Sequence, residues 1–144
     1  MKEYRFYGNE YADVKPADND SKVKDLKDLY DILNEIWSAD TCAPRMRKDW
    51  NTENRTLGQC SITSFLIQDL FGGRVYGVPL GDGNFHCYNL IADKIFDLTC
   101  EQFKTGLPYD LSHEQFREDH FYKKEKYERY LLLRSRLEEK LAKR

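Results

Sequence analysis

The sequence has no excess of charge of either sign. Its 23 lysine and arginine residues nearly balance its 25 aspartate and glutamate residues, which leaves a formal net charge of −2. A protein that attracts nucleic acid or an anionic membrane through its overall field needs a basic surplus, so the composition argues against both partners. We therefore expect the function to reside in a localised site.

Long apolar runs and a secretory leader are also missing. Uncharged apolar stretches extend for only a few residues, and the first residues, Met1 to Tyr4, lack the apolar core of a signal peptide. These two absences predict a soluble, cytoplasmic protein with no membrane partner.

No pair of cysteines has the Cys-x-x-Cys spacing. The four cysteines, at positions 42, 60, 87 and 100, are too few and too widely spaced for a disulfide scaffold or a structural zinc site. We expect four reduced thiols, no metal site and no cofactor.

The length of 144 residues fits a single domain built around one core. Residues 1–20 are polar and rich in turn formers, which predicts a partly mobile N-terminal segment. Residues 21–110 should form the core, and residues 111–144 should form C-terminal helices.

Two stretches have the pattern of buried helices. Apolar residues recur at three- and four-residue steps from Ser21 to Trp37, which predicts one helix. A second, mostly apolar helix should begin at or beside Cys60 and end at Gly72-Gly73. Because it is apolar on most sides, we expect this helix to be central.

Three short stretches, residues 74–78, 85–91 and 94–98, predict the strands of an antiparallel meander. Ser112 and Gln115 resemble a capping box that would begin the C-terminal helical region. The sequence therefore predicts an α+β fold in which the cysteine-bearing helix packs on a small antiparallel sheet with flanking helices. A helical bundle with a peripheral hairpin is the alternative.

Cys60, His86 and Asp97 follow one another in an order that suits a thiol nucleophile, an imidazole base and a carboxylate that orients the base. A helix N-terminus favours the thiolate form of a cysteine. If Ala92-Asp93 is a two-residue turn, Asp97 pairs opposite Tyr88 and shares a sheet face with His86. Each residue type also has an ordinary structural role, since cysteine is often a small buried hydrophobe.

Residues around the cysteine suggest further parts of a site. The backbone amide of Cys60 could bind an oxyanion, with a side chain such as that of Gln59 or of a connector residue as a second donor. The connector from Trp37 to Trp50 ends shortly before the cysteine, so both tryptophans are candidates for substrate contacts, although they could simply pin the connector to the core. His113 and His120, in a charged region without a nearby cysteine, are interpreted as surface residues.

A set of separated positions resembles a known family. The positions are Trp37-Ser38, Thr41, Trp50, Gly58-Gln59-Cys60, Thr63, Gln68-Asp69, Gly72-Gly73, His86, Asn89, Asp97-Leu98-Thr99 and Gln102-Phe103. They are similar to the pattern of the YunG-like bacterial proteins, a family without an established activity.

More distantly, Gly-Gln-Cys followed by His and then Asp-x-Thr resembles the core of the transglutaminase and papain superfamily. That resemblance implies a papain/transglutaminase-like core with Cys60 as nucleophile, His86 as base and Asp97 as orienter. The spacings between them are shorter than in typical transglutaminases, and Ser61 stands where a tryptophan commonly follows the cysteine.

Two functions are consistent with these residues. The first is a cysteine hydrolase or acyl transferase that acts on an amide or thioester bond in a peptide, protein or small-molecule substrate. The second is a non-catalytic binding or regulatory module that retains the fold of such an enzyme. They differ in one property, because only the enzyme needs Cys60 as a thiolate near neutral pH. The sequence specifies neither the substrate nor the oligomeric state.

Overall fold

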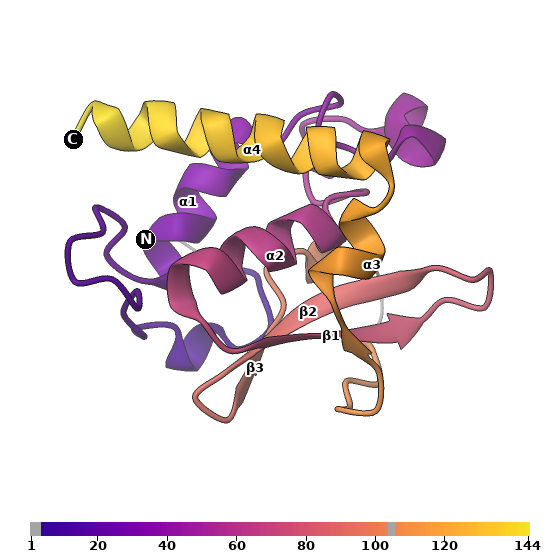
Figure 1. Ribbon diagram of the computed structural model, residues 1–144, viewed down its shortest axis with the longest axis horizontal. Helices are drawn as coiled ribbons and strands as arrows, with labels where there is room; N and C mark the ends of the chain where they lie inside the picture. The colour runs from indigo at the N-terminus through magenta and orange to yellow at the C-terminus, as the bar shows by residue number, and fades with distance from the viewer. Residues whose placement is uncertain (1–3, 104–105) are drawn as a thin grey trace.

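An apolar helix, α2, lies at the centre of the fold. The computed structural model describes residues 4–103 and 106–144, and α2 spans Cys60–Phe71 (Figure 1). Eight of its twelve residues are buried, which explains why its sequence is apolar on most sides. The helix ends at Gly72, whose φ of 77° leaves the helical region at little cost for a residue without a side chain. The expected start at Cys60 and end at Gly72 are both confirmed.

A small antiparallel sheet lies under α2. Within the described residues it has the strand order β3-β2-β1-β4. The strands are β1 (Arg74–Pro79), β2 (Phe85–Ile91), β3 (Lys94–Phe96) and β4 (Glu114–Gln115). The expected meander of the first three strands is confirmed, with a shorter third strand. The chain is therefore an α+β protein.

The turn between β2 and β3 fixes the register of these two strands. Ala92 and Asp93 both have positive φ, 49° and 68°, as a two-residue hairpin turn requires. Asn89 pairs with Phe96, which is the register that the sequence predicted. The strand ends at Phe96, one residue before the expected pairing of Asp97 with Tyr88, and Asp97 bridges to Tyr7.

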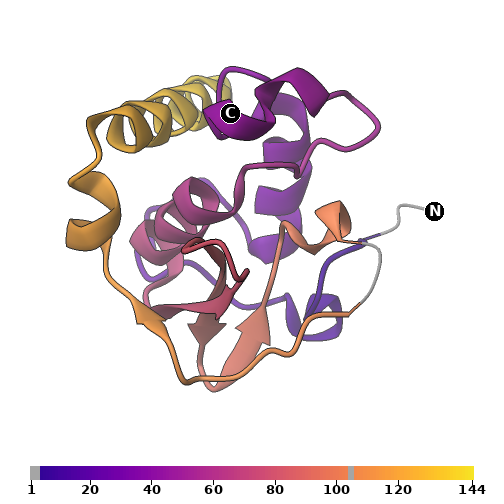
Figure 2. The same cartoon turned by 90° about the vertical axis from the view of Figure 1, so that its right-hand side faces the viewer.

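The other helices add a third layer. α4 (Lys124–Ala142) crosses above α2 and also contacts α1 (Leu26–Ile36), as Figures 1 and 2 show. α1 begins later than expected from Ser21, because Asp25 is its N-cap and accepts a hydrogen bond from the Asp28 amide at 2.9 Å. The short α3 (Arg117–Phe121) joins the sheet to α4.

The prediction of a capping box at Ser112 is wrong. Gln115 lies in β4, where it pairs with Val75 of β1, and the backbone amide of Gly77 donates to the carbonyl of His113 at 2.9 Å. Residues 114 and 115, whose local pattern favoured a helix, therefore pair with the edge of β1. This pairing satisfies backbone groups that the edge strand would otherwise expose.

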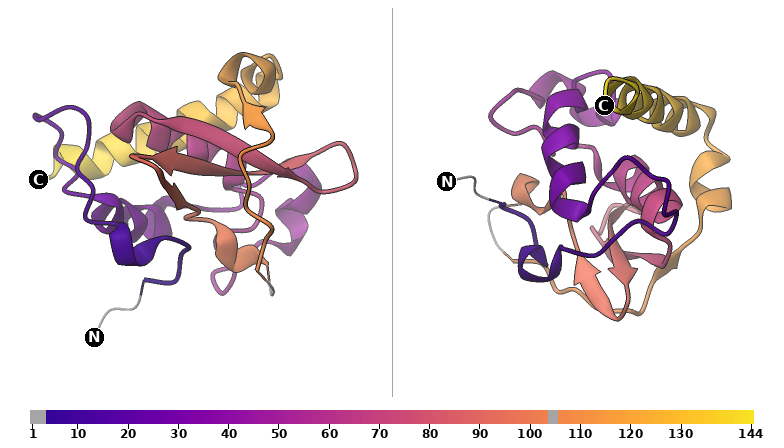
Figure 3. Two further views of the ribbon diagram at one scale, coloured as in Figure 1. Left: turned by 90° about the horizontal axis from the view of Figure 1, so that it is seen from below. Right: turned by 90° about the vertical axis from the view of Figure 1, so that its left-hand side faces the viewer.

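The described part of the N-terminal segment packs against the rest of the chain. Phe6 and Ala12 are buried, and the amide of Ala17 donates to the carbonyl of Leu70 at 2.8 Å. In Figure 3 this segment, drawn in indigo, runs past α1 and α2. Residues 1–3 of the segment expected to be mobile lie outside the described residues.

Short 3₁₀ helices complete the structure at Asn9–Tyr11, Pro44–Asp49 and Cys100–Gln102. The second of these lies in the connector between α1 and α2. None of the helices in the described part of the chain has the length and apolar character that a membrane span needs.

Candidate active site

The thiol of Cys60 stands at the first residue of α2. Gly58 makes the turn into the helix with a φ of 71°, and a Cβ at this glycine would lie 2.5 Å from the sulfur of Cys42. Gln59 is the N-cap but makes no side-chain capping bond. The first amides of α2 are therefore not occupied by the side chain of the N-cap residue, and the positive end of the helix dipole lies at the thiol.

His86 and Asp97 form a buried pair. The distance between His86 Nε2 and Asp97 Oδ2 is 2.6 Å, and each side chain is 1% exposed. Asp97 Oδ2 also accepts from the Tyr109 hydroxyl at 2.6 Å. Its other oxygen, Oδ1, accepts from the amide of Thr99 at 3.1 Å and from the hydroxyl of Thr99 at 3.2 Å. These donors fix the carboxylate, and the carboxylate fixes the imidazole.

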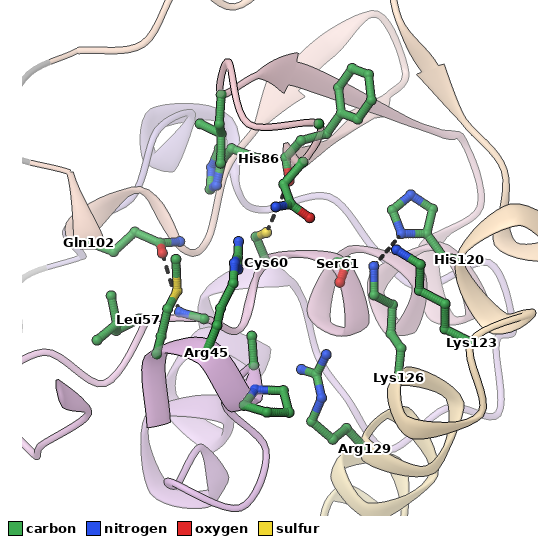
Figure 4. A pocket seen from close by; sticks show the side chains of 18 of the residues that line it. Arg45, Leu57, Cys60, Ser61, His86, Gln102, His120, Lys123, Lys126 and Arg129 are labelled. Atoms are coloured by element: carbon green, nitrogen blue, oxygen red, sulfur yellow. Dashed lines mark hydrogen bonds between the residues drawn. The ribbon is translucent and has the colours of Figure 1, made fainter. Parts of the chain in front are cut away.

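The second ring nitrogen of His86, Nδ1, is buried, has no hydrogen-bond partner among the described residues and is available to the cleft. The ring packs edge-to-face on Phe103, with 4.7 Å between centroids. Figure 4 shows the side chains of His86 and Cys60 pointing into one cleft from neighbouring walls. The imidazole is thus oriented with one nitrogen on a carboxylate and the other on the side of the thiol.

The electrostatics favour an ionised thiol. The neighbouring Cys87 thiol lowers the pKa of Cys60 well below its usual range, and His86 lowers it further against the opposing effect of burial. Contact with Cys60, together with burial, raises the pKa of Cys87. Burial lowers the pKa of His86, but Asp97 and Cys60 more than offset this and raise it to about 10. The lowered pKa of Cys60 and the raised pKa of His86 are the shifts expected of a thiolate beside an imidazolium.

The cleft has a volume of approximately 550 Å³, which suits a small molecule or a short peptide segment. Its walls come from the connector, the start of α2, the β1–β2 hairpin, the segment after β3, and α3 with α4. The lining residues are Ala43, Pro44, Arg45, Met46, Leu57, Gly58, Cys60, Ser61, Leu80, Gly83, Asn84, Phe85, His86, Gln102, Phe103, Gln115, Asp119, His120, Lys123, Glu125, Lys126 and Arg129.

Three of the candidate binding residues lie outside this cleft. Gln59 is fully buried, and its side-chain nitrogen donates to the carbonyl of Ser38 at 3.1 Å. Trp37 is 1% exposed and donates to the hydroxyl of Thr63, which places it in the core. Trp50 donates within its own connector, to the carbonyl of Arg55 at 3.0 Å. The connector does line the cleft, but through other residues than the two tryptophans.

Sequence reasoning missed two residues of the site. His120 was interpreted as a surface residue, yet it lines the cleft together with Cys60. Tyr109 was not considered, because it lies in an irregular segment where no periodicity indicates which side chains are buried. The sequence offered one signal for His120, a histidine flanked by the aromatic residues Phe116 and Phe121.

No group of three or more histidine, cysteine, aspartate or glutamate side chains is arranged to hold a metal ion in residues 4–103 and 106–144. The side chains of the cleft themselves offer a sulfur nucleophile, an imidazole and several cations.

Comparison with known proteins gives one family and one curated relative. The family described as "YunG protein" matches residues 25–142. The relative is "Uncharacterized protein YunG" of Bacillus subtilis (strain 168), which is 35% identical over 78 residues. This alignment covers 54% of the present chain and 63% of the relative, so the chain spans less than two thirds of that protein's length. No solved structure matches the chain.

Proposed function

We infer that this chain, which belongs to the YunG protein family, is a cysteine-nucleophile hydrolase or acyl transferase that acts on an amide or thioester bond. One observation carries the proposal: the thiol at the start of α2 lines the same cleft as His86, whose imidazole is held from behind by the buried Asp97. A structural cysteine has no need of an imidazole that is oriented in this way.

The proposed reaction has two steps. In the first, the Cys60 thiolate attacks the carbonyl carbon of the substrate, and the imidazolium of His86 gives its proton to the departing amine or thiol. In the second, His86 takes a proton from water or another acceptor, which attacks the thioester and releases Cys60. Water as acceptor gives hydrolysis, and an amine gives acyl transfer. The backbone amide of Cys60, at the first residue of α2, is the proposed donor to the developing oxyanion.

We propose in addition that the core is of the papain/transglutaminase-like kind. The supporting features are a cysteine at the first residue of a central helix, and an antiparallel sheet that carries the histidine and delivers the aspartate at the end of the neighbouring strand. The alternative function, a binding or regulatory module without turnover, would use the same cleft but would not require an ionised thiol.

Alkylation tests the enzyme proposal against this alternative. We expect iodoacetamide to modify Cys60 much faster than Cys42, Cys87 or Cys100 near neutral pH, measured by peptide mass spectrometry. His86→Ala should raise the pH midpoint of Cys60 labelling, because the thiolate loses its cationic partner. A rise of one pH unit would correspond to about 1.4 kcal/mol.

Two further variants sharpen this test. Asp97→Asn should raise the midpoint less than His86→Ala does, because it weakens the imidazolium without removing the ring. His113→Ala removes an exposed histidine and should leave the midpoint unchanged. Four thiols of equal reactivity in the folded protein, or a Cys60 midpoint that does not respond to His86, would contradict the enzyme proposal and favour the binding module.

A further inference from the structure

The cleft around Cys60 is cationic in a protein whose net charge is negative. Four basic side chains line it, Arg45, Lys123, Lys126 and Arg129, against two acidic ones, Asp119 and Glu125. The whole chain has a formal charge of −2. The thiolate, the imidazolium and the Asp97 carboxylate together carry a net charge of −1, which offsets only half of the surplus of two positive charges on the lining residues and leaves the cleft cationic.

Among the described residues, three of these four cations have no carboxylate within ion-pair distance. Arg129 is paired with Glu125, whose carboxylate lies 2.5 Å from the guanidinium Nε. Arg45, Lys123 and Lys126 form no ion pair with a carboxylate anywhere in the part of the chain that the structure describes. Unpaired cations on a solvated surface are ordinary, but within a partly enclosed cleft they create a strong field for anions.

Lys126 is held in place by neutral groups. Its ammonium lies 2.9 Å from His120 Nδ1, and His120 Nε2 lies 2.9 Å from the Gln115 side-chain oxygen. Gln115 Oε1 can only accept a hydrogen bond, so His120 carries its proton on Nε2 and donates it to that oxygen, while the unprotonated Nδ1 accepts from the ammonium of Lys126. The chain of three side chains thus orients the ammonium without neutralising it, and two of its three N–H donors remain for a ligand.

The cations also lie on both sides of the thiol. In Figure 4 Arg45 reaches into the cleft from the connector, whereas Lys126 and Arg129 reach in from α4, with Cys60 between them. Burial lowers the pKa of Lys126; the charge on the Cys87 and Cys60 thiols opposes this effect, whereas the neighbouring Lys123 and Arg129 add to it. A bound anion would reverse this effect, so the ammonium and a ligand of negative charge would stabilise each other.

We propose that the substrate of this cleft carries an anionic group, a carboxylate or a phosphate, which Lys126 and Arg45 bind close to the reacting carbonyl while Arg129 and Lys123 add to the field. This inference rests on the proposed function, because it names a substrate class for the same cleft. The cations bind the substrate, and the triad performs the chemistry.

A pair of alkylating reagents distinguishes the effect of the cations from the reactivity of the triad. Iodoacetate and iodoacetamide both transfer a carbon to sulfur with loss of iodide, but only iodoacetate carries a carboxylate. The ratio of their rates at Cys60 therefore reports the field in the cleft, and the same ratio in the urea-unfolded protein is the reference. We expect the ratio to be about fivefold or more higher in the folded protein, because electrostatic attraction raises the local concentration of an oppositely charged reagent.

Variants assign the effect to particular residues. Lys126→Met and Arg45→Gln should each lower the iodoacetate to iodoacetamide ratio about two- to threefold, in line with the loss of one charge near the thiol. Lys124→Met is the matched control, since that lysine lies on the same helix, is 90% exposed and is not among the lining residues. It should leave the ratio unchanged.

Protection then distinguishes binding from attraction alone. Glutarate and inorganic phosphate, compared at constant ionic strength, should slow iodoacetamide labelling of the unmodified protein and act more weakly on Lys126→Met. The ion that protects at the lower concentration identifies the anion as a carboxylate or a phosphate.

Failure of either proposal would be recognisable. Slow labelling of Cys60 by the neutral reagent contradicts the enzyme function. Fast labelling by iodoacetamide with a ratio equal to that of the unfolded protein overturns the anionic substrate alone. An elevated ratio without protection by either ion shows that the cations do not form a binding site, and also overturns it.

Discussion

Tyr109 extends the buried pair of His86 and Asp97 to a third side chain. Its hydroxyl donates to the same carboxylate oxygen that the imidazole contacts, and burial, followed by the charge of Asp97, raises the pKa of the phenol. The phenol therefore remains a donor throughout the range in which the thiol and imidazole titrate. It is a positioning residue, because it acts on the imidazole through the carboxylate.

Tyr109→Phe removes this hydrogen bond and little else. We expect a loss of about 1.5–3 kcal/mol in the free energy of unfolding, the usual range for a hydrogen bond to a charged group. Urea denaturation at pH 7 measures the change, and Tyr122→Phe, at a tyrosine that is 90% exposed, is the matched control. Equal stabilities of the two variants would show that the hydroxyl does not support Asp97.

The three residues of the proposed triad were predictable because local rules place them. A helix start positions Cys60, strand alternation positions His86, and a two-residue turn of fixed geometry brings Asp97 beside it. Tyr109 follows no such rule, since it lies in an irregular segment. The side chain of Gln59 was misassigned for a related reason, because the N-cap position does not determine whether a side chain faces the cleft or the carbonyl of Ser38.

The position of the junction between α3 and α4 was the part of the fold least predictable from the sequence. The charged stretch that contains it has the pattern of solvated helices, but β4 joins the sheet and turns α3 toward the cleft. His120 is thereby packed on Phe65 of α2, with 5.2 Å between ring centroids. Only the tertiary pairing of β4 with β1 determines this placement, and no local pattern of the sequence contains it.

This placement makes the junction sensitive to acid. Burial, and then the charge of Lys126, lowers the pKa of His120 from 6.5 to about 4. A depressed pKa contributes stability that is fully present above pH 6.5 and is lost as the pH falls through about 4, because only the unfolded chain binds the proton readily. Protonation would also set an imidazolium against the ammonium of Lys126.

His120→Asn should reduce this acid sensitivity. We expect the free energy of unfolding to fall less between pH 6.5 and pH 4 in the variant than in the unmodified protein, although the variant is less stable at pH 7. Urea titrations at several pH values measure both curves, and His113→Asn serves as the control at an exposed histidine. Parallel curves for all three proteins would mean that His120 does not titrate differently in the folded state.

At the scale of the whole molecule, the larger of two hydrophobic clusters in the described residues joins all the layers. It includes Phe6 and Val23 before the first helix, Leu33 of α1, Phe65 of α2 and Leu133 of α4. The single domain stays a prediction, and the packing of these segments into one cluster predicts that they unfold together.

Unfolding should accordingly be a single transition. Trp37 is buried between α1 and α2, so its fluorescence reports on the core, whereas far-UV circular dichroism reports on all helices together. In a Trp50→Phe variant, which leaves Trp37 as the sole indole, we expect the two signals to change at the same urea concentration. Separate midpoints, with α4 lost before the fluorescence changes, would contradict a single cooperative unit.

The order of the cleft residues along the chain has a consequence for folding kinetics. His86 and Asp97 are 11 residues apart, and Cys60 is 25 residues from Phe85, with which its sulfur is in contact. Loops of this size close at low entropic cost and on a submicrosecond to microsecond timescale. The cationic wall on α4 comes from much later in the chain and must close a longer loop. A molecule in which only α4 has detached would keep its triad assembled with the thiol uncovered, and this open form would be the one most exposed to peroxide oxidation at Cys60.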